Sequence, residues 1–167
     1  MTVNELKTQI KAFATDQDLT YIRGTEIEAN FKIDDIDSTK RVMVHFDQTE
    51  IGAVISAGSL VVLTVPTQIL FLDIDPEADS DLDTIDNNVE NCEKDALLFY
   101  DYILQNTSVS DLVDIPAPSF ERLPAFKKYN AALSGVLFNC TIPILSTEHL
   151  CPAGAIGFPY TFPFVLS

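Results

Sequence analysis

The sequence predicts an α+β fold: a mainly antiparallel sheet packed against one long and one shorter helix, with an extended C-terminal arm. Two amphipathic segments predict the helices, and several alternating or wholly apolar segments predict the strands. The order helix, strands, long helix, strands is typical of an α+β domain. We expect a single domain over residues 1–149 and an apolar, proline- and aromatic-rich arm over residues 150–167.

The first helix is expected over Val3–Ala14, where apolar residues recur at spacings of four and three. Either Thr2 or Asn4 is suited to cap its start. The apolar face of this helix consists of Leu6, Ile10 and Phe13.

Two short strands are expected next, over Leu19–Arg23 and over Arg41–Phe46, with Gly24 ending the first of them. The intervening segment Thr25–Asp37 is ambiguous, and it fits a short helix better than a strand. His45 is flanked by apolar residues, so we expect a satisfied or half-buried strand histidine rather than a catalytic base.

Strand segments are also expected on both sides of a turn at Gly58-Ser59, within Ile51–Leu72. The second limb, Leu60–Asp73, is long and almost wholly apolar, which predicts a central strand. Pro66 has no N–H to donate, so a bulge or a strand edge is expected there.

The most informative segment is Asp73–Asn106, in which an acid-rich loop leads into a long amphipathic helix. A helix of roughly 25 residues would span roughly 37 Å, enough to cross a small domain. Its predicted apolar stripe consists of Leu82, Ile85, Val89, Cys92, Ala96, Phe99 and Ile103.

The start of this helix also matches part of a calcium-binding loop. The matching residues are Asp79, Asp81, Asp83, Asn87 and Glu90. Thr84 occupies the turn position that requires glycine, and the helical stripe is already continuous from Ile85. We therefore expect no metal here. Ser80 is expected to cap the helix, and the neighbouring aspartates are expected to favour the positive end of its dipole.

After the long helix, Asp114–Pro124 contains three prolines and is expected to be an extended connection that crosses the sheet. Strands are expected over Phe126–Tyr129 and Ala132–Ile144. The apolar residues of the last strand do not share one parity, which predicts a bulge near Gly135. These apolar residues are Leu133, Val136, Phe138 and Ile142.

No charged side chain occurs in the arm, residues 150–167, and its two spaced prolines Pro159 and Pro163 exclude a central strand. An apolar arm of this kind is a liability on a free monomer. It is expected either to fold back over its own core or to dock on a neighbouring subunit. The candidate oligomer-interface residues are Phe158, Tyr160, Phe162 and Phe164.

The formal net charge of −15 argues against a role that needs a basic nucleic-acid surface. An acidic surface suits solubility, repulsion of DNA or mimicry of DNA. No apolar run is long enough for a transmembrane helix, and the N-terminus does not resemble a signal peptide. The odd number of cysteines indicates reduced thiols in a cytosolic setting: Cys92, Cys140 and Cys151.

No catalytic constellation is visible in the sequence, which has neither a phosphate-binding glycine loop nor a G-x-S-x-G motif. Cys140, His149 and Cys151 match no paired zinc motif and offer only three ligands. We expect no enzymatic activity, no cofactor and no metal.

Three stretches of the chain together carry a family resemblance. They are YIRGTEIEANFKIDD, the strand ending ILFLDID with the helix VENCEKDALLFYDYIL, and the late FKKYNAALSGVLFNCTIPI. This layout, over Met1–Ile144, resembles the neck and tail-completion proteins of tailed bacteriophages, of the tail-terminator or head-tail connector type. The resemblance implies an α+β fold with a sheet flanked by helices, and assembly into rings.

The resemblance also implies a structural virion protein that forms a ring of six or twelve copies at the head–tail junction. Its implied partners are further copies of itself, other neck, portal and tail proteins, and DNA passing without specific binding. It would reside in the virion neck or tail, and in the host cytoplasm during assembly, without a membrane. The candidate residues for an acidic lumen that repels DNA are Asp73, Asp75, Glu77, Asp79, Asp81 and Asp83.

The alternative is a small acidic binding or inhibitor protein that mimics DNA. Such a mimic needs carboxylates spaced along one face like phosphates. In this chain the acidic residues concentrate in one loop and at the start of the long helix, which counts against mimicry.

Overall fold

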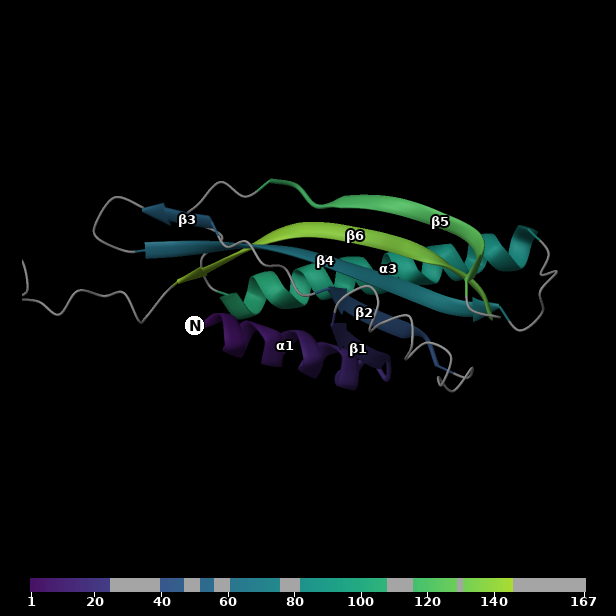
Figure 1. The fold of residues 1–167 in the computed structure, drawn as a ribbon, viewed down its shortest axis with the longest axis horizontal. Helices are drawn as coiled ribbons and strands as arrows, with labels where there is room; N and C mark the ends of the chain where they lie inside the picture. The colour runs from purple at the N-terminus through teal and green to yellow at the C-terminus, as the bar shows by residue number, and fades with distance from the viewer. Residues whose placement is uncertain are drawn as a thin grey trace, which may run out of the picture.

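The computed structural model of the chain describes residues 1–24, 40–46, 52–55, 61–75, 82–107, 116–128 and 131–145. The helices are α1 (Val3–Asp16) and α3 (Leu82–Thr107). The strands are β1 (Thr20–Gly24), β2 (Val42–Phe46), β3 (Gly52–Ile55), β4 (Val61–Asp75), β5 (Ser119–Lys128) and β6 (Ala131–Leu145). Figure 1 shows the long strands of the sheet running beside α3, so the predicted α+β class is confirmed.

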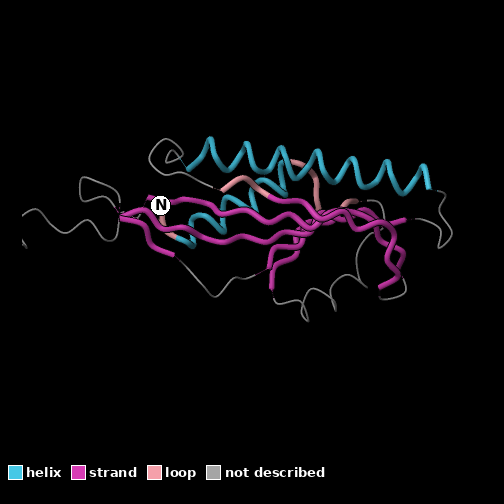
Figure 2. The backbone as a smooth tube through the Cα atoms, turned by 90° about the horizontal axis from the view of Figure 1, so that it is seen from above, coloured by secondary structure: helices cyan, strands magenta, loops and turns pink. Residues whose placement is uncertain are grey.

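The strands form one six-stranded sheet in the order β1-β2-β4-β6-β5, with β3 also pairing with β4. The β1–β2 pair is parallel, and the other described pairs are antiparallel. Seen from above, α3 lies along one face of this sheet (Figure 2). Buried residues of α1 and α3 belong to the same core cluster, so both helices cover that face.

Helix α1 begins with the predicted cap at Thr2. The Thr2 hydroxyl accepts a hydrogen bond from the Glu5 amide at 3.1 Å, and the Glu5 carboxylate accepts one from the Thr2 amide at 2.7 Å. This reciprocal capping box satisfies two amides that have no partner within the helix. The predicted face is buried, so the pattern of the first helix is confirmed: Leu6, Ile10, Phe13 and also Ala14.

Helix α3 has 26 residues and buries the predicted stripe from Ile85 to Ile103. The assignment of Leu82 to this stripe is wrong, because that side chain is 79% exposed. Leu82 is the first residue of a helix that begins at the end of the sheet, where little of the sheet lies beneath it (Figure 1). The aromatic ring of Phe99 anchors the helix, with its centroid 5.3 Å from that of Phe13 and 6.0 Å from that of Phe138.

Strand β4 is the central strand, as predicted. It pairs with β6 without a register shift from Val62–Leu145 to Asp75–Ala132. Its other edge is shared, since β3 pairs with residues 61–64 and β2 with residues 68–72. Pro66 lies between these two ladders, at a position that no described strand occupies on that side. Residues 47–51, which connect β2 to β3, lie outside the described ranges, so the predicted strand edge at Pro66 stays a prediction; no bulge forms there against β6.

Strand β5 corrects the prediction that Asp114–Pro124 is a connection crossing the sheet. Residues from Ser119 onward form the edge strand next to β6. Pro124 falls at a register shift between Leu123 and Phe126, where the β5–β6 ladder is interrupted. An edge strand tolerates proline at such a bulge, because no ladder hydrogen bond is needed there.

The bulge predicted in β6 near Gly135 is also wrong, because β6 buries residues on both faces. Phe138 and Ile142 pack in the large cluster under the helices, whereas Leu133 packs in a second cluster with Val44 and Leu72. Gly135 is instead a point of close approach. A Cβ atom there would lie 2.0 Å from the carbonyl oxygen of Phe71.

Several predictions fall on residues outside the described ranges. They are the short helix within Thr25–Asp37, the turn at Gly58-Ser59, the cap at Ser80 and the arm over residues 150–167.

Candidate functional site

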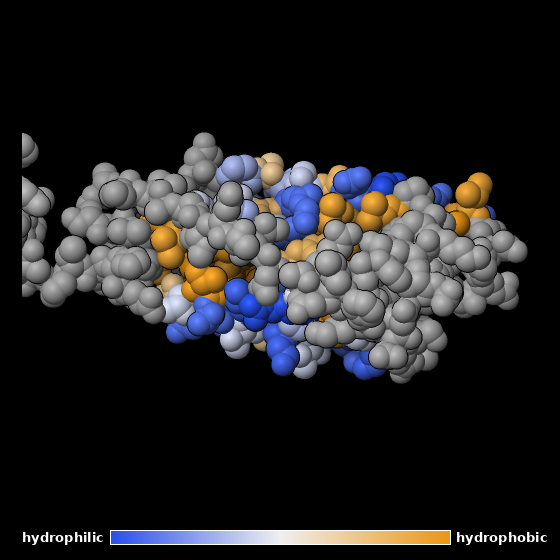
Figure 3. Space-filling model, viewed as in Figure 1, coloured by the Kyte–Doolittle hydropathy of each residue, from blue (hydrophilic) through white to orange (hydrophobic). Residues whose placement is uncertain are grey.

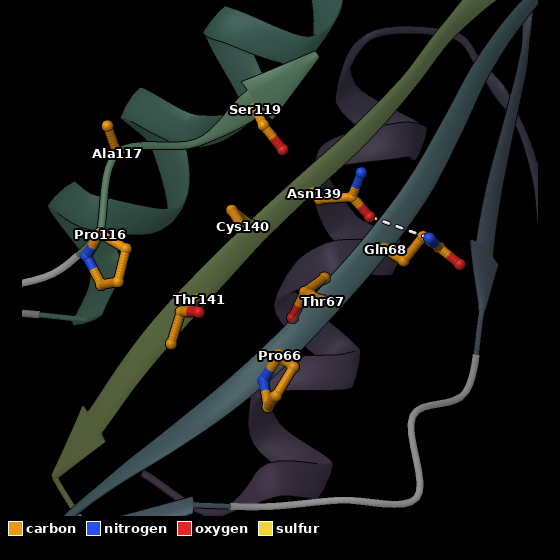
Figure 4. A pocket seen from close by; sticks show the side chains of 9 residues that line it. All are labelled: Pro66, Thr67, Gln68, Pro116, Ala117, Ser119, Asn139, Cys140 and Thr141. Carbon is orange, nitrogen blue, oxygen red and sulfur yellow. Dashed lines mark hydrogen bonds between the residues drawn. The ribbon is translucent and has the colours of Figure 1, made fainter. Parts of the chain in front are cut away.

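The best-formed hollow among the described residues is a trough of about 380 Å³ over β4, β6 and the segment that enters β5 (Figure 4). We call it the β4–β6 trough. It is lined by Pro66, Thr67, Gln68, Pro116, Ala117, Ser119, Asn139, Cys140 and Thr141.

The trough lies on the face of the sheet that points away from the helices. Ile69 and Phe138 pack in the cluster under α1 and α3. Because successive side chains of a strand point to opposite faces, their neighbours Gln68 and Asn139 point the other way. Figure 4 shows the helices behind the strands that carry these two amides. On the face shown in Figure 3, apolar groups form a band bordered by hydrophilic groups.

The polar centre of the trough is a pair of amide side chains. Gln68 and Asn139 are partners in the β4–β6 ladder, and Gln68 Nε2 donates a hydrogen bond to Asn139 Oδ1 at 2.9 Å (Figure 4). Each amide carries both a donor and an acceptor, so this bond uses only half of each group. Gln68 Oε1 and Asn139 Nδ2 therefore keep an acceptor and a donor that this bond does not use.

Cys140 lies on β6 beside the trough, but its side chain packs in the core cluster under the helices and is chemically quiet. Burial raises the pKa of Cys140 to about 12, so the thiol is protonated at neutral pH. Cys92 and Cys140 are both buried free cysteines. The other members of the weighed zinc set, His149 and Cys151, lie outside the described ranges.

A second polar feature joins the sheet to α3. The guanidinium of Arg41 lies 3.2 Å (Nη2) from Asp95 Oδ1 and 3.1 Å (Nε) from Asp95 Oδ2. Only the first of these contacts has good hydrogen-bond geometry, so Oδ2 of the buried carboxylate is held by charge alone. Burial raises the pKa of Asp95, nearby Arg41 lowers it, and the charge of Asp73 raises it. This pair is structural, since it connects α3 to the segment that enters β2.

The predicted lumen residues fall into three groups. Asp73 is half-buried beside Asp95, under the helix rather than on an open surface. Asp75 ends β4, and Asp83 is exposed in the first turn of α3. Glu77, Asp79 and Asp81 lie outside the described ranges.

The solvent-facing side of α3 carries four of the eight exposed acidic residues in the described part of the chain. We call this side the outer face of α3; it includes Asp83, Asp86, Glu90, Leu97, Leu98 and Asp101. Leu97 and Leu98 are each 51% exposed, which is unusual for adjacent leucines on an acidic helix. A groove of about 300 Å³ lies beside them, where Leu98 and Asp101 approach Phe13 and Asp16 of α1. This face combines apolar contact area with negative charge.

The two weighed alternatives within described elements have structural explanations. His45 is 5% exposed and its Nδ1 lies 3.0 Å from the Tyr21 hydroxyl, as predicted for a satisfied strand histidine. Asp83, Asn87 and Glu90 of the calcium-loop match all lie within α3. Across the described ranges, no three His, Cys, Asp or Glu side chains cluster as metal ligands would.

Sequence reasoning missed both the trough and the buried carboxylate. Gln68 and Asn139 are 71 positions apart, and no local pattern marks either of them. Asp95 did carry a signal: it lies three residues after Cys92 and four before Phe99, which places it on the buried stripe. The candidate arm residues Phe158, Tyr160, Phe162 and Phe164 lie outside the described ranges.

Comparison with protein-family models, with curated proteins and with solved structures gives no match to this chain. Among the described residues, neither helix is long and apolar enough to cross a membrane.

Proposed function

We propose that this protein is a structural subunit of a ring at the head–tail junction of a tailed bacteriophage. In this role six or twelve copies join the capsid portal to the tail and surround the DNA passage. The partners are neighbouring copies and other neck, portal and tail proteins. The protein resides in the virion neck or tail, after assembly in the host cytoplasm.

The observation that carries the proposal is the presence of two different contact surfaces on opposite sides of the sheet. One is the outer face of α3, with Leu97 and Leu98 each 51% exposed. The other is the β4–β6 trough on the face away from the helices. Subunits related by cyclic symmetry contact one another through two unlike surfaces, and the presence of two unlike surfaces on this chain supports the proposal.

The layout of the chain gives further support. The long strand β4, the 26-residue helix α3 and the late strand β6 follow the order on which the family resemblance was based. The acidic balance suits a subunit that surrounds DNA, because a chain of net charge −15 repels the phosphate backbone. Asp83, Asp86 and Glu90 on α3 are exposed carboxylates available for such repulsion.

Imaging of purified particles tests this proposal. We expect a ring of six or twelve copies at the neck, visible by cryo-electron microscopy and by labelling with an antibody against this chain. Absence of the chain from purified particles would contradict it. The acidic passage is tested separately with the variant Asp83→Asn/Asp86→Asn/Glu90→Gln. Unchanged genome release and assembly would exclude a role for these carboxylates.

One observation favours the second candidate, an inhibitor that mimics DNA. The carboxylates of Asp83, Asp86 and Glu90 recur about once per turn along α3. Lys94 and Leu97 then interrupt this row on the same exposed side. Light scattering separates the two candidates: a large ring supports the virion role, whereas a monomer that binds a DNA-processing enzyme supports mimicry.

A further inference from the structure

The β4–β6 trough is uncharged in a strongly charged protein. The chain has 25 acidic and 10 basic residues, yet none of the described residues that line the trough is charged. An occupant bearing charge would lose its hydration here without gaining a counter-charge. The trough therefore favours an uncharged occupant.

The amide pair adds a requirement for hydrogen bonds. After Gln68 donates to Asn139, Gln68 Oε1 is left as an acceptor and Asn139 Nδ2 as a donor. If the nitrogen and oxygen of both amides are exchanged, one donor and one acceptor are again left unused. The presence of one donor and one acceptor therefore does not depend on how the two amides are oriented. A neighbouring donor and acceptor match the C=O and N–H of a peptide group in an extended segment.

The margins of the trough are apolar. Pro66, Pro116 and Ala117 are exposed on the two sides of the amide pair. Figure 4 shows Pro66 on β4 and Pro116 with Ala117 across β6 from it. Such small rigid surfaces accept the flat faces of aromatic rings or further proline rings.

The C-terminal arm has the chemistry that this trough selects. Residues 150–167 carry no charged side chain. Aromatic residues alternate with other residues from Phe158 to Phe164, and Pro159 and Pro163 keep the backbone extended. The prolines lack an N–H, so the remaining peptide groups must supply the hydrogen bonds to the amides.

We propose that the arm of one subunit lies in the β4–β6 trough of the adjacent subunit. This inference rests on the proposed ring, because it requires neighbouring copies. The trough residue Thr141 lies four residues before Leu145, roughly 13 Å back along the strand, so a subunit's own arm would have to reverse direction to reach it. The 22 residues from 146 to 167 reach up to roughly 75 Å when extended, which spans to a neighbour.

Photo-crosslinking in the full-length protein tests this placement. A benzophenone amino acid replaces the exposed trough residue Ala117, and the matched control replaces the exposed Lys94 on α3. A second full-length chain, co-expressed with the first, carries Val165→Ile as a mass mark in its arm. We expect marked arm peptides to be crosslinked from position 117 and not from position 94. Crosslinks to unmarked arms alone, or none to any arm, would overturn the proposal.

The hydrogen-bonding step is tested with Gln68→Ala/Asn139→Ala in the crosslinking chain. We expect the yield of marked arm crosslinks to fall about fivefold or more, since each lost hydrogen bond is worth roughly a fivefold change. The control Ser119→Ala, also in the trough, should retain the yield. Circular dichroism and the urea midpoint verify that both variants fold, and an unchanged yield in the folded double variant would contradict the assigned role of the amides.

The two proposals fail in distinguishable ways. A ring at the neck without arm crosslinks from position 117 leaves the proposed function intact and removes this inference. If marked arm peptides are crosslinked from position 117 but the protein is absent from virions, the arm contact is supported and the proposed neck function is excluded.

Discussion

Arg41 and Asp95, 54 positions apart, hold the sheet and the long helix together through contacts of 3.2 and 3.1 Å. Asp95 is buried within the stripe of α3, whereas Arg41 is one-third exposed just before β2. Burial outweighs the attraction to Arg41, so the pKa of Asp95 is raised. The ionised form of the Asp95 carboxylate is therefore stabilised chiefly by Arg41, its one close cation among the described residues.

Substitution of Arg41 by alanine should destabilise the protein, because it leaves Asp95 buried without its cation. We expect a loss of roughly 2–3 kcal/mol in the free energy of unfolding, below the value for a fully buried pair because Arg41 is partly exposed. Urea denaturation at neutral pH measures it. Adding Asp95→Asn should restore part of the loss. Arg122→Ala removes the exposed pair with Glu93 and serves as the control, with little change expected. Equal effects of Arg41→Ala and Arg122→Ala would contradict the prediction.

Protonation of Asp95 should stabilise the folded protein. The pKa is raised in the folded state, so the folded state binds this proton more tightly than the unfolded state. The contribution is fully present below the ordinary value of 3.8 and is lost as the pH rises through the raised folded value. We expect the free energy of unfolding of the wild type, relative to that of Asp95→Asn, to decrease as the pH rises. Urea titrations between about pH 3 and pH 7 measure it, and a difference that increases with pH would refute this assignment.

Gly135→Ala should disrupt the centre of the sheet. The added Cβ would lie 2.0 Å from Phe71 O and 3.0 Å from Leu72 Cα, so backbone atoms of β4 would have to move. We expect a loss of about 3 kcal/mol or more, at the upper end for overpacked sites. Thr141→Ala on the same strand, which adds no atom to the sheet, is the control. Thermal denaturation followed by circular dichroism compares the two, and a melting temperature close to the wild type for Gly135→Ala would disprove the close approach.

Phe99→Ala should remove the aromatic anchor of α3. Its ring is fully buried against Phe13, Phe71 and Phe138. Deleting it costs the burial of the ring and leaves a cavity, for an expected loss of about 3–5 kcal/mol. Leu97→Ala on the exposed side of the same helix should change stability by no more than about 0.5 kcal/mol. Denaturation in urea measures both, and similar losses would mean that α3 does not pack as described.

The helices and the central strand were predictable because a one-sided apolar pattern leaves a local signature. Thr2 and the stripe from Ile85 to Ile103 are examples, since each depends on neighbours within a few residues. The errors arose where burial or pairing came from distant segments. Three prolines suggested a connection at Asp114–Pro124, but only the neighbouring β6 reveals an edge strand whose Pro124 lies at a bulge.

The expected bulge in β6 is wrong for a related reason. If only one face of the sheet were buried, the parity of Leu133 would require a bulge, but a second cluster covers the opposite face and buries Leu133 there. The trough is still less accessible from sequence, because Gln68 and Asn139 meet only through the register of β4 with β6. Uncharged polar residues in strands are common and show no sign of a site until the strands are paired.

The ladder between β4 and β6 also dictates when the protein can finish folding. β4 ends at Asp75, but its partner is complete only at Leu145, seventy residues later. At synthesis rates of about 5–20 residues per second, a ribosome needs roughly 4–14 s to make that stretch. Until β6 begins to emerge at Ala131, one long edge of the largely apolar strand β4 has no partner. The nascent chain is therefore most vulnerable to aggregation in the seconds before β6 emerges, and rapid synthesis of this stretch protects it.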